Sequence, residues 1–338
     1  MPRTLGAFSA AAFLLLTSAC SSQTPPPVVE TSCLTAGTSD AGFGVSGYTS
    51  SPVTPDFYAS DTRTLVDLDD PAVDDDGALI SQMTHDRGPG YHPVALAQYG
   101  LASLGSFRLT GNPEYLRRAE ATAHKLLDGA TPAADGSLWF AYPFDYSLHG
   151  DENMTLSAPW HSGMAQGQGL SLFVRLAETT SDPAWARAAD QTFLTFQPRE
   201  QGSMDPESPW FAHVDSGGCL WFEEYVGSVE PTQVVNGHIY AMYGVADYVR
   251  LTQDTTAADL FDGAATTVVQ NFSSYRAPGA VSFYCASPYC KDVGWQPGSY
   301  HRGVVKQLET LSLMTSDRAF LDRANILRSD YLDSGSED

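Results

Sequence analysis

Positive charge is scarce in this chain of 338 residues. It has 18 Lys and Arg against 40 Asp and Glu, a formal net charge of −22 at pH 7. Nucleic acids and other polyanions are captured by clusters of basic side chains, so this balance argues against a nucleic-acid-binding protein. It also argues against loose electrostatic capture of any acidic polymer, unless the few basic residues gather in one groove.

Long apolar runs are also scarce, and none after the N-terminus is long enough to cross a membrane. Arg3 is followed by the run GAFSAAAFLLLTSA and then Cys20. The run is too short to span a bilayer and suits a signal peptide, which we expect over residues 1–19. The small residues before Cys20 favour its lipidation, with residues 20–40 as a proline-rich lipoprotein tether. We therefore expect an exported cell-envelope lipoprotein, anchored to the membrane only by this lipid, with plain secretion as the alternative.

Cysteines are few and widely spaced. If Cys20 carries lipid, four remain: Cys33, Cys219, Cys285 and Cys290. In an oxidising compartment they allow three pairings, among which the sequence alone cannot choose. Proximity favours Cys285–Cys290, which leaves Cys33 to join Cys219. Their scatter does not resemble a zinc site, so no metal is expected.

A helical hairpin is repeated four times along the chain. Each copy has the end of one helix, a polar turn residue and the start of the next helix; the turn residues are Asn112, Asp182, Asp254 and Asp317. Their side chains can accept hydrogen bonds from unpaired N–H groups at a helix start, and Pro113 and Pro183 suit the first helical position. The copies lie roughly 65–75 residues apart, which is right for helix pairs separated by long insertions.

The repeat predicts a mainly α fold, an incomplete α/α toroid of about four helical hairpins over residues 91–333. Residues 41–90 are expected as an N-terminal extension packed on it. Aromatic segments between the pairs, such as WFAYPFDY at 139–146, read as short β-hairpins. Because the long connections emerge at one end of the toroid, we expect these hairpins at one rim, where aromatic side chains could bind sugar rings.

Several segments resemble a known family. HPVALAQYGL at 92–101, APWHSGMAQGQG at 158–169, WFEEY at 221–225, VNGHIY at 235–240 and SYH at 299–301 occur in the order seen in the C-terminal domain of D-glucuronyl C5-epimerases. The resemblance covers about residues 80–333. It implies inversion at C5 of D-glucuronyl residues in a heparosan-like or other uronate polysaccharide, without a cofactor.

The resemblance also implies roles for particular residues. Glu224, Tyr284 and Tyr300 take the catalytic positions; the substrate-binding residues would be Tyr225, Asn236, His301, Arg302, Trp160 and Gln98. Inversion needs a base on one face of the sugar and a proton donor on the other, which a carboxylate and a phenol can supply. Since Glu223 and Glu224 alternate in an expected strand, we expect Glu224 to face the cleft and Glu223 to face solvent.

Three positions depart from the family pattern: Val226 replaces a proline, Cys285-Ala286-Ser287 replaces a stretch with arginine, and Val304 replaces a histidine. Arg302, Lys291 or Lys306 are candidates to restore the positive charge.

Two other functions stay open. One is a non-catalytic polysaccharide-binding lipoprotein; the other is a polysaccharide lyase or glycoside hydrolase on the same toroid. A hydrolase needs a second carboxylate, for which Asp145, Asp215 and Glu207 are candidates. A homodimer is also open.

Overall fold

The computed structural model describes residues 32–35, 37–51, 65–69, 72–82, 88–200, 208–227 and 229–333. The chain divides into two compact units, Met1–Glu30 and Thr31–Asp338, and every described residue lies in the second. The predicted signal peptide, Cys20 and most of the predicted tether lie outside the described residues. Within these ranges no helix has the length and apolar character required to cross a bilayer.

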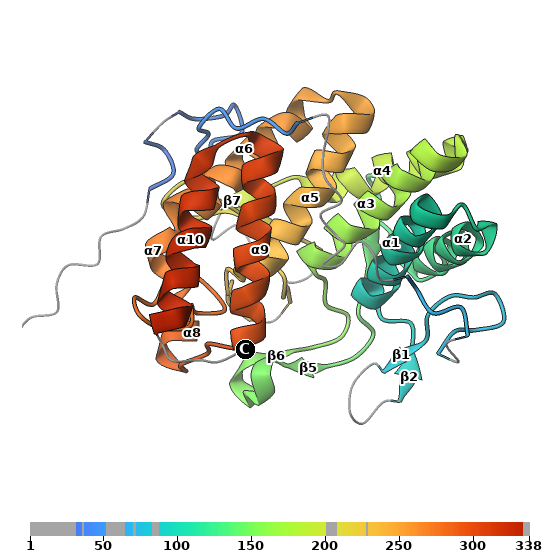
Figure 1. Cartoon of the computed structure of the whole chain (residues 1–338), viewed down its shortest axis with the longest axis horizontal. Coiled ribbons are helices and arrows are strands. Elements are labelled where there is room, and N and C mark those ends of the chain that lie inside the picture. The colour runs from blue at the N-terminus through green and yellow to red at the C-terminus, as the bar shows by residue number, and fades with distance from the viewer. Residues whose placement is uncertain are drawn as a thin grey trace, which may run out of the picture. The chain divides into compact units, whose positions relative to one another are not determined.

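Four helix pairs follow one another along the chain, as the repeat predicts. They are α1 (Pro93–Thr110) with α2 (Pro113–Asp128), α3 (Gly163–Thr180) with α4 (Pro183–Phe193), α5 (Val235–Thr252) with α6 (Thr255–Gln270), and α9 (Gly298–Thr315) with α10 (Arg318–Asp333). The first helices form an inner row in which α1 contacts α3, α3 contacts α5 and α5 contacts α9, while each second helix packs on its own partner (Figure 1). The predicted incomplete α/α toroid is confirmed.

The turn inside each pair has the same chemistry in all four copies. A threonine hydroxyl at the end of the first helix donates to the carbonyl four residues earlier and accepts from the N–H two residues later, at 3.1–3.2 Å; these are Thr110, Thr180, Thr252 and Thr315. Two residues after the threonine, a side-chain oxygen accepts a hydrogen bond of 2.7–3.1 Å from a backbone N–H of the second helix. These capping residues are Asn112, Asp182, Asp254 and Asp317. The predicted caps are confirmed, and Pro113 and Pro183 each lie in the first turn.

Glycine allows the two central helices to approach closely. A Cβ on Gly167 of α3 would lie 2.3 Å from the Cα of Ala241 in α5, and one on Gly244 would lie 2.2 Å from the carbonyl oxygen of Gly167. Neighbouring Gln166 accepts from the N–H of Phe140 at 2.7 Å, so it ties an inserted strand to α3. This segment has the architectural role expected of small residues early in a helix.

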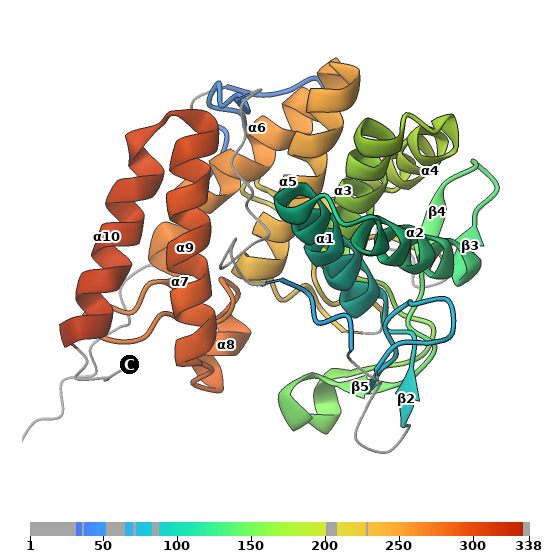
Figure 2. The same ribbon diagram turned by 45° about the vertical axis from the view of Figure 1, so that its right-hand side comes forward.

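The strands are short and lie in the connections. Antiparallel pairs are β1 (Ser81–Gln82) with β2 (Pro89–Gly90), β3 (Ala130–Pro132) with β4 (Leu138–Phe140), and β5 (Tyr146–Ser147) with β6 (Thr155–Leu156); β7 (Arg199–Glu200), β8 (Ala212–Val214) and β9 (Leu220–Phe222) form one sheet. Short helices are η1 (Leu148–Gly150), η2 (Glu152–Met154), η3 (Leu194–Phe196), α7 (Phe272–Tyr275) and α8 (Pro288–Asp292). β2, β5 and α8 lie together at the end of the toroid where α1 and α9 begin (Figure 2). The β insertions therefore occupy one rim, opposite the capped turns.

Residues 33–48 are fastened to α6 and to the segment before β9. Cys33 forms a disulfide with Cys219, just before β9. The Asp262 carboxylate of α6 accepts from the N–H groups of residues 46–48 at 2.8–3.0 Å. Three charge-assisted hydrogen bonds to one carboxylate, together with a covalent link, hold this segment against the sheet that leads into the site.

Candidate active site

Glu224 and Tyr225 follow strand β9 at the rim where the inner helices begin. The N–H of Gly163, the first residue of α3, donates to the carbonyl of Glu223 at 2.7 Å, and a Cβ on Gly163 would lie 2.6 Å from that oxygen. Val226 and His161 exchange two backbone hydrogen bonds of 3.0 Å. A proline at 226 would lack the N–H for this bridge. The strand and the start of α3 thus hold the Glu-Glu-Tyr segment from both sides.

Glu223 is fully buried, so its expected position in solvent is wrong. One carboxylate oxygen lies 2.9 Å from Nε2 of His213, and the other accepts from the N–H groups of Thr232 and Gln233 at 3.1 and 2.8 Å. Both carboxylate oxygens are thus engaged in joining β8 to the loop before α5. These contacts give Glu223 a structural role.

Glu224 is 8% exposed and packs against the first turn of α5. A Cβ on Gly237 would lie 2.3 Å from its Oε2, so only glycine leaves room for the carboxyl group. Oε2 is buried without a hydrogen-bond partner. Burial raises the pKa of Glu224 to about 7, against the opposing effect of hydrogen bonds from Tyr225 and Tyr284. A carboxyl group that titrates near neutrality suits proton transfer.

Three tyrosines surround this carboxyl group. The hydroxyl of Tyr284 donates to Oε1 of Glu224 at 3.3 Å and lies 3.1 Å from the hydroxyl of Tyr225. The ring of Tyr300, in the first turn of α9, meets that of Tyr284 edge-on at 4.6 Å. Burial, followed by the charge of Glu224, raises the pKa of each of the three phenols. All three phenols therefore stay protonated near neutral pH and can donate hydrogen bonds.

The three residues predicted to be catalytic thus lie together. Tyr284 is 3% exposed and contacts both of the others, whereas Tyr300 is 41% exposed and forms the open side of the cluster. Tyr284 is held by backbone hydrogen bonds to Trp295 and Val235. Its neighbour Cys285 forms the disulfide with Cys290 that proximity favours, and the remaining pair, Cys33–Cys219, is also formed as predicted.

Of the predicted substrate-binding residues, Tyr225, Asn236 and Trp160 lie at the site, whereas Gln98 lies outside it. Tyr225 lies in the cluster, and Asn236 lies beside Gly237 with its Oδ1 buried and unpaired. Trp160 forms the back of the site: it is 3% exposed and stacks on Tyr142 at 3.8 Å. Gln98 is exposed on α1 and does not line the cavity described below.

His301 and Arg302 face α10 instead of the cluster. The His301 ring accepts at Nδ1 from the N–H of Ser282 at 3.0 Å and lies 3.1 Å from the carbonyl of Leu327 through Nε2. Arg302 donates to the hydroxyl of Tyr331 at 3.0 Å. Both side chains join α9 to neighbouring segments, so neither is placed to hold the sugar or to lower the pKa of Tyr300.

The other basic candidates are no closer to the cluster. The Lys291 ammonium lies over the Phe283 ring, 5.9 Å from its centroid, and Lys306 is exposed on the third turn of α9. Among the described residues, the side chains that donate to the Glu224 carboxyl group are the phenols of Tyr225 and Tyr284.

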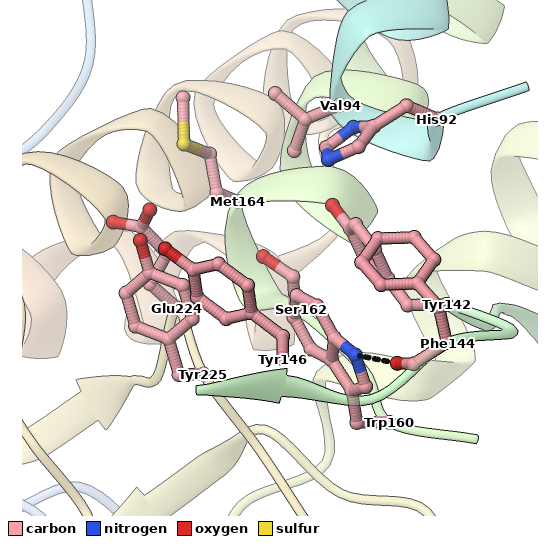
Figure 3. Close-up of a pocket in the computed structure, with 10 residues that line it drawn as sticks. All are labelled: His92, Val94, Tyr142, Phe144, Tyr146, Trp160, Ser162, Met164, Glu224 and Tyr225. Carbon is pink, nitrogen blue, oxygen red and sulfur yellow. Dashed lines mark hydrogen bonds between the residues drawn. The ribbon is translucent and has the colours of Figure 1, made fainter. Parts of the chain in front are cut away.

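A cavity of about 150 Å³ adjoins Glu224 on the side of α1 and α3 (Figure 3). Its walls are His92, Val94, Tyr142, Phe144, Tyr146, Trp160, Ser162, Met164, Glu224 and Tyr225. Sequence reasoning missed most of these as site residues. The available signal was the aromatic 139–146 segment, which we expected at the rim without assigning individual roles.

His149 was also missed. It lies in η1 at the tip of the β5–β6 hairpin with φ of 55°, stacks on Trp295 at 3.7 Å and meets the Tyr284 ring edge-on at 5.1 Å. The hydroxyl of Tyr289 in α8 also reaches Asp151 of this hairpin at 3.4 Å. The hairpin tip therefore packs over Tyr284 and limits its exposure to water. A lone histidine in a loop carried no signal of this role.

The described residues contain no group of three or more His, Cys, Asp or Glu side chains arranged to hold a metal ion.

The chain is similar in sequence or in fold to several known proteins. A D-glucuronyl C5-epimerase of Caenorhabditis elegans is 27% identical over 157 residues, which are 45% of this chain and 24% of that protein. The match thus spans about a quarter of the relative's length. A solved D-mannose isomerase is similar with a TM-score of 0.50 and 12% identity over 76% of this chain and 64% of that chain. A cellobiose 2-epimerase from Bacillus thermoamylovorans has a TM-score of 0.47 and 11% identity, over 77% of this chain and 66% of that chain.

At 12% identity the likeness to the isomerase shows a common fold alone. The family match is more specific, because the family described as "D-glucuronyl C5-epimerase C-terminus" matches residues 134–329, more than half of the chain. That range includes Glu224, Tyr225, Tyr284 and Tyr300. The chain therefore belongs to the D-glucuronyl C5-epimerase C-terminus family.

Proposed function

We propose that this protein catalyses cofactor-independent epimerisation at C5 of D-glucuronyl residues in a heparosan-like or other uronate polysaccharide. The observation that supports this most directly is the contact between the Tyr284 hydroxyl and Glu224, a buried carboxyl group with a pKa of about 7. This contact places a carboxyl group with a pKa near neutrality beside protonated phenols, at one end of the α/α toroid.

In the first step the Glu224 carboxylate removes the hydrogen from C5 as a proton. The electron pair of the C–H bond passes into the adjoining uronate carboxylate, which then gathers a second negative charge. The phenols of Tyr225 and Tyr284 are the donors closest to this charge, and hydrogen bonds in place before the reaction lower the barrier most.

In the second step Tyr300 donates its proton to the opposite face of C5 and becomes a phenolate. The proton held by Glu224 then returns to Tyr300 through Tyr284, which is hydrogen-bonded to both. Each group regains its starting form. The cycle breaks one C–H bond and makes another, and it needs no redox partner.

The environment of the other carboxylates favours this function over hydrolysis. Asp215 accepts from the indole N–H of Trp221 at 3.0 Å and from two turn N–H groups at 2.9 Å. Asp145 accepts from the N–H of Ala158 at 2.9 Å. Both are engaged in holding their own loops, while Glu207 lies outside the described residues. A second carboxylate free to flank a glycosidic bond is therefore not found among the described candidates.

We also propose that the protein is exported and anchored to the cell envelope through lipid on Cys20. The two disulfides support export, because structural disulfides are typical of oxidising compartments. Labelling of the intact protein with a lipid precursor tests the anchor: label that survives Cys20→Ser contradicts it.

The activity is tested by incubating the protein with desulfated heparosan and other uronans in deuterated water and reading the sugars by NMR. Deuterium at C5 is the expected result. An unsaturated uronate would instead identify a lyase, shortened chains without unsaturation a hydrolase, and an unchanged polymer a binding protein.

The variants Glu224→Gln and Tyr300→Phe are each expected to lower the exchange rate by about 10²–10⁴-fold, the usual contribution of a positioned acid or base. Tyr248→Phe is the matched control: it removes a phenol hydroxyl from the far end of α5, where it donates to Asp190. Wild-type exchange in both site variants would refute the proposed chemistry.

A further inference from the structure

His301 joins the chain segment that carries Tyr284 to the helix that carries Tyr300. Ser282 lies two residues before Tyr284, and its backbone N–H donates to Nδ1 of His301 at 3.0 Å, while its hydroxyl lies 2.9 Å from the same nitrogen. His301 follows Tyr300 directly in the first turn of α9, where the ring of Tyr300 meets that of Tyr284 edge-on at 4.6 Å. Two adjacent contacts, Ser282–His301 and Tyr284–Tyr300, therefore connect the same two segments.

The hydrogen bonds of His301 fix which ring nitrogen carries the proton. A backbone N–H can only donate, so Nδ1 is the unprotonated acceptor. The proton then lies on Nε2, which donates to the carbonyl oxygen of Leu327 in α10 at 3.1 Å. The side chain is 2% exposed and its ring stacks on that of Tyr331 with centroids 5.2 Å apart. Burial lowers the pKa of His301, so the ring is neutral near pH 7 and is held in one orientation.

The next two peptide groups of the segment are bound to other parts of the fold. The N–H of Phe283 donates to a carbonyl of α7 at 2.8 Å, and the N–H of Tyr284 donates to a carbonyl in the loop before α9 at 3.0 Å. Of these three successive N–H groups, that of Ser282 is the one bound to the helix that carries Tyr300. The separation of the Tyr284 and Tyr300 phenols therefore depends on the bond to His301.

We propose that His301 is a positioning residue, which sets the placement of Tyr284 relative to Tyr300 by accepting the Ser282 N–H at Nδ1. The proposal rests on the proposed function, in which Tyr300 delivers a proton to C5 and recovers one through Tyr284. Proton transfer depends steeply on geometry, and a displacement of about 1 Å can lower a rate on the order of 100-fold. His301 acts through the two tyrosines and does not touch the sugar.

Two substitutions separate the roles of the two ring nitrogens. His301→Asn keeps an acceptor near the position of Nδ1 and loses the donor to Leu327, whereas His301→Gln keeps a donor near the position of Nε2 and loses the acceptor for Ser282. Each variant leaves one buried backbone group without its partner, so both should lower Tm by similar amounts. We expect kcat for C5 exchange to fall about 100-fold in the Gln variant with little change in KM, and to stay near the wild-type value in the Asn variant.

His124→Gln makes the same chemical change at an exposed position on the outer helix α2 and should leave both kcat and Tm unchanged. Equal losses of exchange in the two His301 variants would overturn the proposal, because His301 would then contribute packing alone. Wild-type exchange in the Gln variant would overturn it as well.

Nitrogen-15 NMR of the wild-type protein provides a readout that does not depend on activity. We expect the His301 ring to carry its proton on Nε2 and the rings of Tyr284 and Tyr300 to show a nuclear Overhauser contact that the Gln variant weakens and the Asn variant keeps. A ring protonated on Nδ1 would overturn the proposal, because it could not accept from Ser282. If these signals are as expected but the wild-type protein exchanges no uronan, the positioning role stands and the epimerase function fails.

Discussion

Replacing Glu224 with glutamine is expected to stabilise the folded protein at alkaline pH and to leave its stability nearly unchanged in acid. The carboxyl group is buried with one oxygen unpaired, and its pKa is about 7 instead of the ordinary 4.5. Because the folded-state pKa is the higher one, the folded protein binds this proton more tightly than the unfolded chain. The stability that this proton supplies is complete below about pH 4.5 and is lost as the pH rises through about 7.

The gap between the two pKa values corresponds to about 3 kcal/mol. Glutamine has a similar shape and no charge, so it escapes this loss. At pH 8.5 the free energy of unfolding of the variant should therefore exceed that of the wild type by about 3 kcal/mol. For a chain of this size, this corresponds to a Tm higher by on the order of 5 °C. At pH 4.5 the two should coincide.

Thermal unfolding followed by circular dichroism at pH 4.5, 7 and 8.5 measures the effect. Glu120→Gln makes the same chemical change on the outer helix α2 and serves as the control. A variant that is no more stable than the wild type at pH 8.5, or equally stabilised at all three pH values, would show that the Glu224 carboxylate is not desolvated. Glu224 would then lack the raised pKa that suits it to act as a base near neutral pH.

Three further predictions follow from the same contacts. The acid limb of the C5 exchange rate should have its midpoint near pH 7, since Glu224 must lose its proton to act as the base; a midpoint near 4.5 would contradict this. Gly237→Ala should lower exchange at least about 100-fold without loss of helical signal, because the new Cβ displaces the carboxyl group, whereas Gly303→Ala on α9 meets no atom within 4 Å and should be neutral. Asp262→Ala should lower the free energy of unfolding by about 1.5–3 kcal/mol in denaturant titrations, since it leaves three backbone N–H groups without their charged acceptor, and Asp259→Ala on the same helix should cost less.

The local features were predictable because they are encoded within a few residues. Each cap joins a side chain to an N–H two or three positions away, so Asn112 or Asp254 reads as a helix start wherever the rest of the chain lies. The threonine before each cap repeats in all four copies and could have strengthened the alignment of the pairs.

The orientation of single side chains was less predictable. Period-2 alternation separates Glu223 from Glu224 but does not say what covers either face, and the sheet and loop around Glu223 bury it completely. In the same way, Tyr300 and His301 are adjacent in sequence, yet the rotation of about 100° between successive helical residues directs Tyr300 to Tyr284 and His301 to α10.

By itself, the sequence determined four capped helix pairs, their long aromatic connections and the residue types capable of moving a proton. These depend on short-range periodicity and hydrogen bonding, which act before the chain is compact. Only the tertiary structure decided that Glu224 and Tyr284, 60 residues apart, share a hydrogen bond, that burial brings the pKa of the carboxyl group near neutrality, and that an aromatic cavity lies beside it. Such properties depend on which surfaces exclude water, and exclusion of water is set by packing between segments that are distant in the chain.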